Sequence, residues 1–358
     1  MFKTSIILLI FGTLITKHSF FTNANECALN TECVHIRDCP RVLNNFHLIR
    51  NKPYCSLNQK GTHVCCLKPP EKYTQEKDED IRSVRECKSV QRYRKSCEKT
   101  LIVSGQKAEA QEFPFMALLF YKHEDTVNYL CGGTLISNKY VLTAAHCFFV
   151  YSPPNWVRLG ELDYSTTTDD ASPIDYEIKN IITHPQYFTT DIQEKYNDIA
   201  LVELVKEVQF NDYIMPACLP LVDGRDFQEY LAAGWGRPND TTLEMSPHLL
   251  KVKLDRFDDD TCISKVEQTE ELKYGVNKRT QMCAGSFTDK RDTCMGDSGG
   301  PLFVDHPDYK CLFLVLGITS FSHGGCGNVG HPAVYTRIQL YLDWIEQIVW
   351  KEAAKLSK

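Results

Sequence analysis

The cysteines constrain the folding of this chain more than any other feature of its sequence. Sixteen occur in 358 residues, and such an even, high count indicates an oxidising compartment and a disulfide framework. Residues 27–66 are too few to bury a stable core without cross-links. Their cysteines allow 15 pairings, among which spacing alone does not choose. A zinc site is the weaker alternative, because no paired CxxC spacing occurs. The cysteines here are Cys27, Cys33, Cys39, Cys55, Cys65 and Cys66.

Residues 1–24 have the pattern of a secretory signal peptide. Lys3 supplies a positive charge, the apolar run 6–15 is too short to span a bilayer, and Ala24 is a small residue suited to cleavage. A membrane anchor is the competing interpretation. The net charge of −6 provides no basic surface for nucleic acid. We therefore predict a secreted, extracellular protein with no nucleic-acid and no membrane partner.

The remaining chain changes character twice. Residues 67–101 are charged with few apolar side chains, which predicts an exposed linker. From residue 102 onward, short β-rich runs alternate with turns, which predicts an all-β sandwich or barrel. Apolar residues at helical spacing over 341–350 predict a closing amphipathic helix. The β-rich runs are 115–121, 140–143, 178–182, 199–204 and 313–318.

Three short motifs carry the chemistry. A serine hydroxyl becomes a useful nucleophile when a histidine takes its proton, and a buried carboxylate fixes that histidine. The chain supplies His146, Asp198 and Ser298 in this order, and the order distinguishes the known families of such enzymes. The motifs are Leu142-Thr143-Ala144-Ala145-His146-Cys147, Asn197-Asp198-Ile199-Ala200-Leu201 and Gly296-Asp297-Ser298-Gly299-Gly300-Pro301.

With these motifs, residues 102–358 resemble a chymotrypsin-fold serine protease domain of the S1 family. The resemblance implies two packed six-stranded β-barrels with the active site between them and a C-terminal helix. It implies that His146 is the general base, Asp198 its orienting carboxylate and Ser298 the nucleophile. Backbone N–H groups of Gly296 and Ser298 would form the oxyanion hole. The segments Ala233-Gly234-Trp235-Gly236, Cys218-Leu219-Pro220 and Tyr335-Thr336-Arg337 extend the match.

Residues 27–66 resemble a clip domain, the disulfide module that precedes many arthropod secreted proteases. The adjacent pair Cys65-Cys66 is the most specific part of this signature, and an unrelated cystine-rich module is the alternative. Clip module, linker or propeptide (67–101) and protease domain together resemble cascade proteases of the snake and persephone type. The clip resemblance implies the disulfides Cys27–Cys65, Cys33–Cys55 and Cys39–Cys66.

The protease resemblance also assigns a specificity pocket. Asp292 would lie at its floor, where a carboxylate selects Arg or Lys because a buried charge is costly without a partner. Ser320, Ser322 and Ala333 would line its walls. Ser322 and Ala333 stand where trypsins carry glycine, which predicts a narrower pocket and slow turnover.

Ten cysteines remain outside the clip segment. Three pairs match family disulfides: Cys131–Cys147, Cys262–Cys283 and Cys294–Cys326. Cys218 resembles the position that tethers the propeptide in zymogens of this fold. We expect Cys87 and Cys97 to pair with Cys218 and Cys311, in an order that the sequence leaves open, so the clip domain would stay attached after cleavage.

The segment Lys99-Thr100-Leu101-Ile102-Val103-Ser104-Gly105 resembles the activation site of the fold. Cleavage between Leu101 and Ile102 would free an α-amino group that pairs with Asp297. Leu101 departs from the Arg or Lys usual before such a bond. This predicts an activator of chymotrypsin- or elastase-like preference, of host or microbial origin.

The leading hypothesis is a zymogen endopeptidase that cleaves after Arg or Lys in an extracellular cascade of innate immunity, such as prophenoloxidase or Toll-ligand activation. A non-catalytic clip-domain homologue, a digestive trypsin and a venom protease are the alternatives. The expected partners are downstream zymogens, an upstream protease and serpins. Asn239-Asp240-Thr241 is an N-glycosylation sequon.

No cofactor is predicted. The stretch from Glu161-Leu162-Asp163 to Asp169-Asp170 lies where some trypsins bind calcium. Its carboxylate positions match that site poorly, so an ordinary acidic surface loop is the favoured interpretation and no metal site is predicted.

Overall fold

The computed structural model describes residues 81–93, 106–124, 126–187, 194–322 and 325–350, and the backbone of residues 31–35, 54–58 and 61–67. The chain divides into two units, Met1–Gln75 and Glu76–Lys358. In the first unit, strands β1 (Thr31–His35), β2 (Tyr54–Asn58) and β3 (Gly61–Leu67) form an antiparallel sheet in the order β1–β3–β2. The predicted signal peptide lies outside the described residues, as do the side chains that would form the clip disulfides.

The first barrel of the second unit is a closed sheet of six antiparallel strands in the order β10–β7–β6–β5–β8–β9. Its interior is apolar because each strand turns one side inward; Leu119, Leu142 and Leu201 are fully buried there. The strands are β5 (Met116–His123), β6 (Thr126–Leu135), β7 (Tyr140–Thr143), β8 (Trp156–Leu159), β9 (Ile174–Thr183) and β10 (Ala200–Leu204).

The second barrel closes because strand β11 pairs with both β12 and β14. A short strand, β4 (Gln106–Lys107), adds to the outside of β12. The expected fold of two six-stranded barrels is therefore confirmed. The strands are β11 (Glu229–Gly234), β12 (Leu250–Phe257), β13 (Gln281–Gly285), β14 (Pro301–Asp305), β15 (Phe313–Phe321) and β16 (Ala333–Arg337).

Aromatic side chains join the two barrels. Phe113 and Phe115, which lead into β5, contact Phe303 of β14 and Phe313 of β15 with ring centroids 5.1–5.5 Å apart. All four of these contacts are tilted or edge-on, the geometry that aromatic pairs prefer. The seam between the barrels is therefore packed, and it fixes the loops that meet there.

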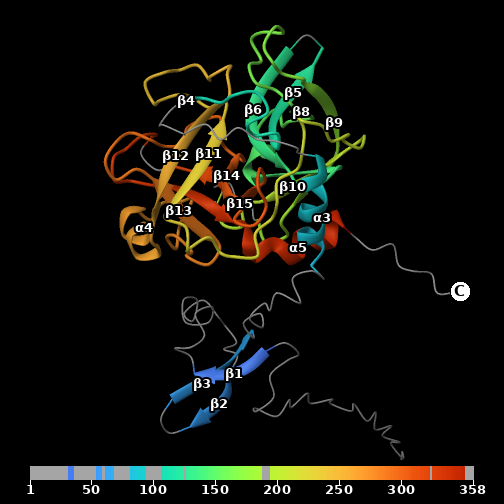
Figure 1. The fold of residues 1–358 in the computed structure, drawn as a ribbon. Helices are drawn as coiled ribbons and strands as arrows, with labels where there is room; N and C mark the ends of the chain where they lie inside the picture. The colour runs from blue at the N-terminus through green and yellow to red at the C-terminus, as the bar shows by residue number, and fades with distance from the viewer. Residues whose placement is uncertain are drawn as a thin grey trace, which may run out of the picture. The chain divides into compact units, whose positions relative to one another are not determined.

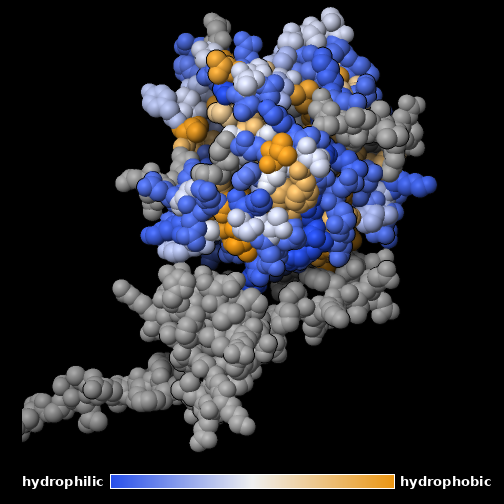
Figure 2. Space-filling model, turned by 90° about the vertical axis from the view of Figure 1, so that its left-hand side faces the viewer, coloured by the Kyte–Doolittle hydropathy of each residue, from blue (hydrophilic) through white to orange (hydrophobic). Residues whose placement is uncertain are grey.

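Few helices occur in the described residues. Helix α4 (Asp259–Lys265) begins at Asp258, whose Oδ1 accepts the Thr261 N–H at 2.8 Å as an N-cap. The 3₁₀ turn η4 (Ile338–Tyr341) leads into α5 (Leu342–Val349), which confirms the predicted C-terminal helix. On the face shown in Figure 2, apolar side chains form small separate groups among hydrophilic ones.

The predicted exposed linker contains a docked helix, α3 (Arg82–Val90), followed by the 3₁₀ turn η2 (Gln91–Tyr93). It lies beside α5 (Figure 1). Arg82 Nη1 donates to the carbonyl oxygen of Trp350 at 2.6 Å, and the Ser83 N–H donates to Glu346 Oε1 at 2.9 Å. The expectation of a wholly exposed linker was wrong for this stretch. The buried positions are Ser83, Cys87 and Val90. These three residues do not form a hydrophobic pattern from which a buried helix face could be predicted.

Candidate active site

Asp198 is completely buried just before β10, where it meets groups from both barrels. Its Oδ2 accepts His146 Nδ1 at 2.7 Å, and its Oδ1 accepts the His146 backbone N–H at 2.9 Å. His146 lies in the 3₁₀ turn η3 (Ala145–Phe148), directly after β7. Because a carboxylate can only accept, Nδ1 carries the proton and Nε2 is free to act as a base. This is the tautomer that proton abstraction requires.

The charge of Asp198 is favoured by its neighbours. Burial acts to raise the pKa of this carboxyl group, but the facing His146 holds the pKa below its usual range, helped by Lys195 and the Ser320 hydroxyl. The Thr336 hydroxyl also donates to the Asp198 backbone carbonyl at 2.8 Å. The carboxylate therefore remains ionised opposite His146.

Ser298 lies in the tight turn before β14, held between the barrels. Its carbonyl accepts the Gly132 N–H of β6 at 2.8 Å, and the next N–H, of Gly299, donates to Thr319 of β15 at 2.8 Å. Gly299 has a φ of +78°, and a Cβ there would overlap the Thr143 hydroxyl. Within the described residues, the Ser298 hydroxyl makes no hydrogen bond to His146. Such contacts often tighten only when substrate binds.

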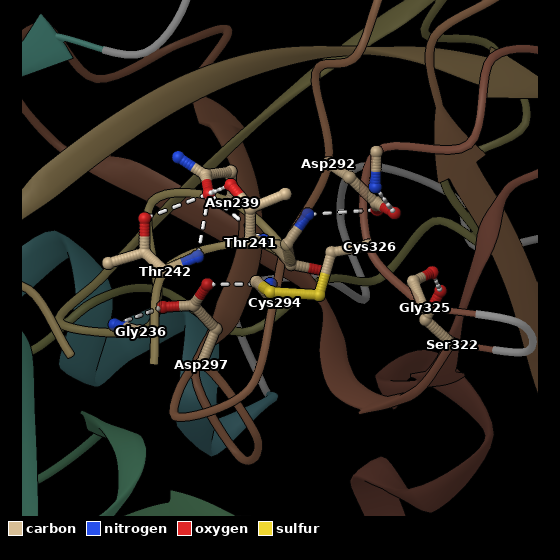
Figure 3. The surroundings of a disulfide bond; sticks show 12 residues. Gly236, Asn239, Thr241, Thr242, Asp292, Cys294, Asp297, Ser322, Gly325 and Cys326 are labelled. Carbon is tan, nitrogen blue, oxygen red and sulfur yellow. Dashed lines mark hydrogen bonds between the residues drawn. A yellow bond between two sulfur atoms is a disulfide. The ribbon is translucent and has the colours of Figure 1, made fainter. Parts of the chain in front are cut away.

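The loop that precedes Ser298 is fixed by Asp297. Its Oδ1 accepts the Gly236 N–H and its Oδ2 accepts the Cys294 N–H, both at 2.9 Å (Figure 3). Burial raises the pKa of Asp297 to about 6, and no cation faces it among the residues described. Gly296 has a φ of +99°, and a Cβ there would lie 2.9 Å from the Gly236 Cα. This loop conformation therefore requires glycine.

Asp292 lies beside the Cys294–Cys326 disulfide (Figure 3). Its two carboxylate oxygens accept the Thr293 N–H at 2.9 Å and the Gly327 N–H at 3.0 Å. Burial, with a smaller contribution from Asp297, raises its pKa to about 7. A carboxylate with no cation of its own in the described residues suits the capture of a basic side chain.

The three residues predicted to line the pocket walls make the following contacts. The Ser320 hydroxyl is buried and donates to Asp198 Oδ2 at 2.5 Å. The Ser322 hydroxyl donates to the Gly325 carbonyl at 3.1 Å, within its own loop. Ala333 packs in the apolar core of the second barrel. Ser320 is therefore a positioning residue for Asp198, a role that the sequence analysis missed because it rests on a distance and not on a motif.

A second contact that the sequence analysis missed supports the residue before Asp198. Asn197 has a φ of +54°, a left-handed conformation that is uncommon for a residue with a side chain. Its Oδ1 accepts the Tyr341 hydroxyl, next to α5, at 2.9 Å. The C-terminal segment thus holds the backbone turn that presents Asp198.

The disulfides Cys131–Cys147, Cys262–Cys283 and Cys294–Cys326 are present, as the resemblance implied. The structure decides one pairing that the sequence left open, because Cys87 of α3 bonds to Cys218. Cys311 is also in a disulfide. Cys97, Leu101 and Ile102 lie outside the described residues.

The acidic loop considered for calcium is organised around an arginine. Arg158 donates to both carboxylate oxygens of Asp175, at 2.6 and 3.0 Å, and to Glu161 at 3.1 Å. Asp163 accepts from Ser165, and Asp169 accepts from the Asp163 N–H. The guanidinium of Arg158 already neutralises Glu161 and Asp175, and Asp163 and Asp169 accept from neighbouring groups of the same loop.

Two clusters in the described residues could in principle hold a metal ion: Cys87, Cys218 and His306, and Cys131, His146 and Cys147. Each contains both sulfurs of a disulfide. Disulfide sulfurs are not thiolate ligands, so neither cluster suits a metal.

Comparison with known proteins agrees with this geometry. The Trypsin family profile matches residues 102–345. Melanization protease 1 of Drosophila melanogaster is 38% identical over 274 residues, which cover 69% of this chain and 65% of that protein. Serine protease snk of the same organism is 39% identical over 258 residues, covering 70% of this chain and 58% of that protein. The chain thus spans about three fifths of these two relatives.

A third relative matches over most of both chains. CLIP domain-containing serine protease B4 of Anopheles gambiae is 33% identical over 348 residues, which cover 89% of each protein. No helix among the described residues is long and apolar enough to cross a membrane. On the family profile, the relatives and the two closed barrels, the chain belongs to the trypsin family of serine proteases.

Proposed function

We propose that this protein is a secreted zymogen that, once cleaved, hydrolyses protein substrates after Arg or Lys in an extracellular proteolytic cascade. The observation that carries the proposal is the buried Asp198, which binds His146 and Ser320 across the two barrels. Relatives named Melanization protease 1 and Phenoloxidase-activating factor 3 support the cascade role and suggest downstream zymogens as substrates.

In the proposed mechanism, the Ser298 hydroxyl attacks the scissile carbonyl while Nε2 of His146 takes its proton. The ionised Asp198 stabilises the imidazolium that forms. The backbone N–H groups of Gly296 and Ser298 donate to the developing oxyanion, and each such donor is typically worth about 2.7–4 kcal/mol in the transition state. His146 then returns the proton to the leaving amine, and water repeats the sequence on the acyl-enzyme.

Asp292 would select the basic side chain before the scissile bond. Its two backbone donors hold the carboxylate in place. An arginine or lysine supplies the cation that this group lacks in the described residues, whereas an apolar side chain leaves a buried carboxylate without a partner. The expected discrimination is therefore large.

Activation would follow cleavage between Leu101 and Ile102. The new α-amino group would pair with Asp297, whose carboxylate lines a cavity of about 310 Å³ together with Gly234, Gly236 and Lys251. An ion pair there would lower the raised pKa of Asp297 and hold the Gly296 loop in working geometry. Because Leu101 precedes the bond, an enzyme that cleaves after Arg or Lys should not activate itself.

The test is hydrolysis by the purified, activated protein. We expect cleavage of Arg and Lys peptide amides and no cleavage of matched Phe or Leu amides. Ser298→Ala should fold normally and lose several orders of magnitude in turnover. A wild-type enzyme that cleaves the Phe amide best would refute the specificity, and a fully active Ser298→Ala would refute the triad.

A further inference from the structure

The sequence contains one Asn-X-Ser/Thr sequon, Asn239-Asp240-Thr241, and nothing in the proposed mechanism uses it. Asn239 is exposed and lies two residues after Arg237. Its Oδ1 accepts the N–H and hydroxyl of Thr241 at 3.1 and 2.6 Å, and those of Thr242 at 2.9 and 2.8 Å (Figure 3). The side chain is therefore held in one orientation.

This orientation leaves the amide nitrogen available. Two of the donors to Oδ1 are backbone N–H groups, which cannot accept, so the bonded atom is the oxygen and not the nitrogen. Nδ2 points away from Thr241 and Thr242 (Figure 3). The Thr241 hydroxyl, which the sequon requires, already contacts the asparagine that would be modified.

The segment that carries Asn239 rests on the loop beside the nucleophile. The Arg237 N–H donates to the Met295 carbonyl at 2.8 Å. A Cβ at Gly296 would lie 3.1 Å from the Met245 sulfur. Met295 itself is 59% exposed and Leu243 is 80% exposed. A group attached at Asn239 thus starts at the rim of the candidate active site, on the side of the loop that carries Met295 and Gly296.

We propose that Asn239 carries an N-linked glycan that limits the approach of large protein ligands to the active site while leaving small substrates unaffected. The glycan site rests on the sequon and the geometry, and its gating effect also rests on the proposed protease function. Transfer would join Nδ2 to the anomeric carbon of the oligosaccharide and break that carbon's bond to a lipid-linked pyrophosphate donor. The lipid pyrophosphate leaves, and the amide proton is lost. The disulfides of the protease domain, such as Cys87–Cys218 and Cys294–Cys326, indicate the oxidising secretory route that this reaction needs.

The first measurement is occupancy. The full chain is secreted from eukaryotic cells, and its glycopeptides are identified by mass spectrometry. We expect a glycan at Asn239 in the wild type and in Thr241→Ser, and none in Asn239→Gln or Thr241→Ala. Thr242→Ala is the matched control, because it removes one hydroxyl contact to Asn239 but keeps the sequon. An unmodified Asn239 in the secreted wild type overturns the site.

The second measurement separates gating from catalysis. After activation, each variant is tested with an Arg tripeptide amide and with a Kunitz-fold protein inhibitor of trypsin-like enzymes. Glycan-free Asn239→Gln and Thr241→Ala should bind the inhibitor about threefold faster or more, because association depends on steric access. Their kcat/KM on the tripeptide should match the wild type and Thr242→Ala. Equal inhibitor association rates with and without the glycan overturn the gating.

Failure of the proposed function looks different. An activated wild type that neither cleaves the tripeptide nor binds the inhibitor refutes the protease assignment and, with it, the gate. The occupancy measurement still decides the glycan site in that case, because it does not depend on activity.

Discussion

Ser320 and His146 share one oxygen of Asp198: the Ser320 hydroxyl donates to Oδ2 at 2.5 Å and His146 Nδ1 donates to the same atom at 2.7 Å. Ser320 comes from β15 of the second barrel, whereas His146 and Asp198 belong to the first. The carboxylate that would orient the base is thus itself oriented by the opposite barrel.

Removing this contact should slow catalysis without unfolding the protein. Ser320→Ala leaves Asp198 one donor short, and a hydrogen bond to a charged group is worth about 1.5–3 kcal/mol. We expect kcat/KM on an Arg amide to fall at least about tenfold, with thermal stability little changed. Ser322→Ala is the matched control, because within the described residues its hydroxyl donates to Gly325 in its own loop and not to Asp198. Equal activities of the two variants would contradict the positioning role.

Ligand binding in the specificity pocket should depend on pH. The pKa of Asp292 is raised to about 7, so the group is protonated below this pH and ionised above it. Benzamidine, a cation, should bind the activated enzyme with a Kd that rises about 100-fold from pH 8 to pH 5, one factor of ten for each unit below the pKa. Asp292→Asn should bind weakly at every pH. A wild-type Kd that stays constant from pH 8 to pH 6 would count against the assignment.

The same group has a consequence for stability. The pKa of Asp292 is about 7 in the folded protein, above the ordinary value of 3.8, so the folded state binds more protons than the unfolded state between pH 3.8 and about pH 7. Stability due to this group therefore decreases as the pH rises through this window. Urea denaturation should show that Asp292→Asn has a larger free energy of unfolding than the wild type at pH 8. This difference between variant and wild type should be smaller at pH 4. A gain that is larger at pH 4 would contradict this sign.

The light chain, which is the fragment N-terminal to the cleavage site at Leu101–Ile102, should remain attached to the protease domain after activation. Cys87 of α3 bonds to Cys218 of the protease domain, a separation of 131 residues in the sequence, and we propose that Cys97 bonds to Cys311. Denaturing gels of the cleaved protein should therefore show two chains only after reduction. Two free chains without reductant would contradict the tether.

Helix α3 should also hold the light chain without disulfides. With these four cysteines replaced by serine, the cleaved chains should still co-elute from a sizing column under native conditions, because Arg82 and Ser83 bind α5. Glu346→Gln removes the negative charge at the N-terminus of α3, worth about 1 kcal/mol, and should weaken the association. Complete separation of the chains with Glu346 intact would show that α3 does not bind the protease domain without the disulfide.

Activation should require cleavage after leucine. N-terminal sequencing of the active heavy chain should give Ile102-Val103-Ser104-Gly105, because only this terminus places an amine in register with Asp297. Trypsin should fail to activate the wild-type zymogen and should activate Leu101→Arg. Full activation of the wild type by trypsin, or by its own active form, would contradict the role of Leu101.

The sequence predicted the parts of the fold that short motifs encode. His146 and Ser298, together with the segments around them, identify a family whose barrels the structure confirms. The residues it misjudged depend on tertiary contacts. Helix α3 buries a serine and a cysteine, and its N-terminus receives a carboxylate from α5 instead of a capping residue of its own. The contact of the Ser320 hydroxyl with Asp198 likewise depends on tertiary structure, while its predicted place in the pocket wall stays a prediction. The partner of Cys87 follows from where α3 docks, which no spacing rule gives.

The contact between Ser83 and Glu346 joins positions 263 residues apart. During synthesis, the N-terminal side of this pair leaves the ribosome long before its partner exists. Helix α3 therefore cannot form its contacts with α5 until α5 has left the ribosome. The domain completes its folding only once nearly all of its residues have been synthesised. A nascent chain stalled before α5 would lack the carboxylate that receives the N-terminus of α3, although both Cys87 and Cys218 would already have been made.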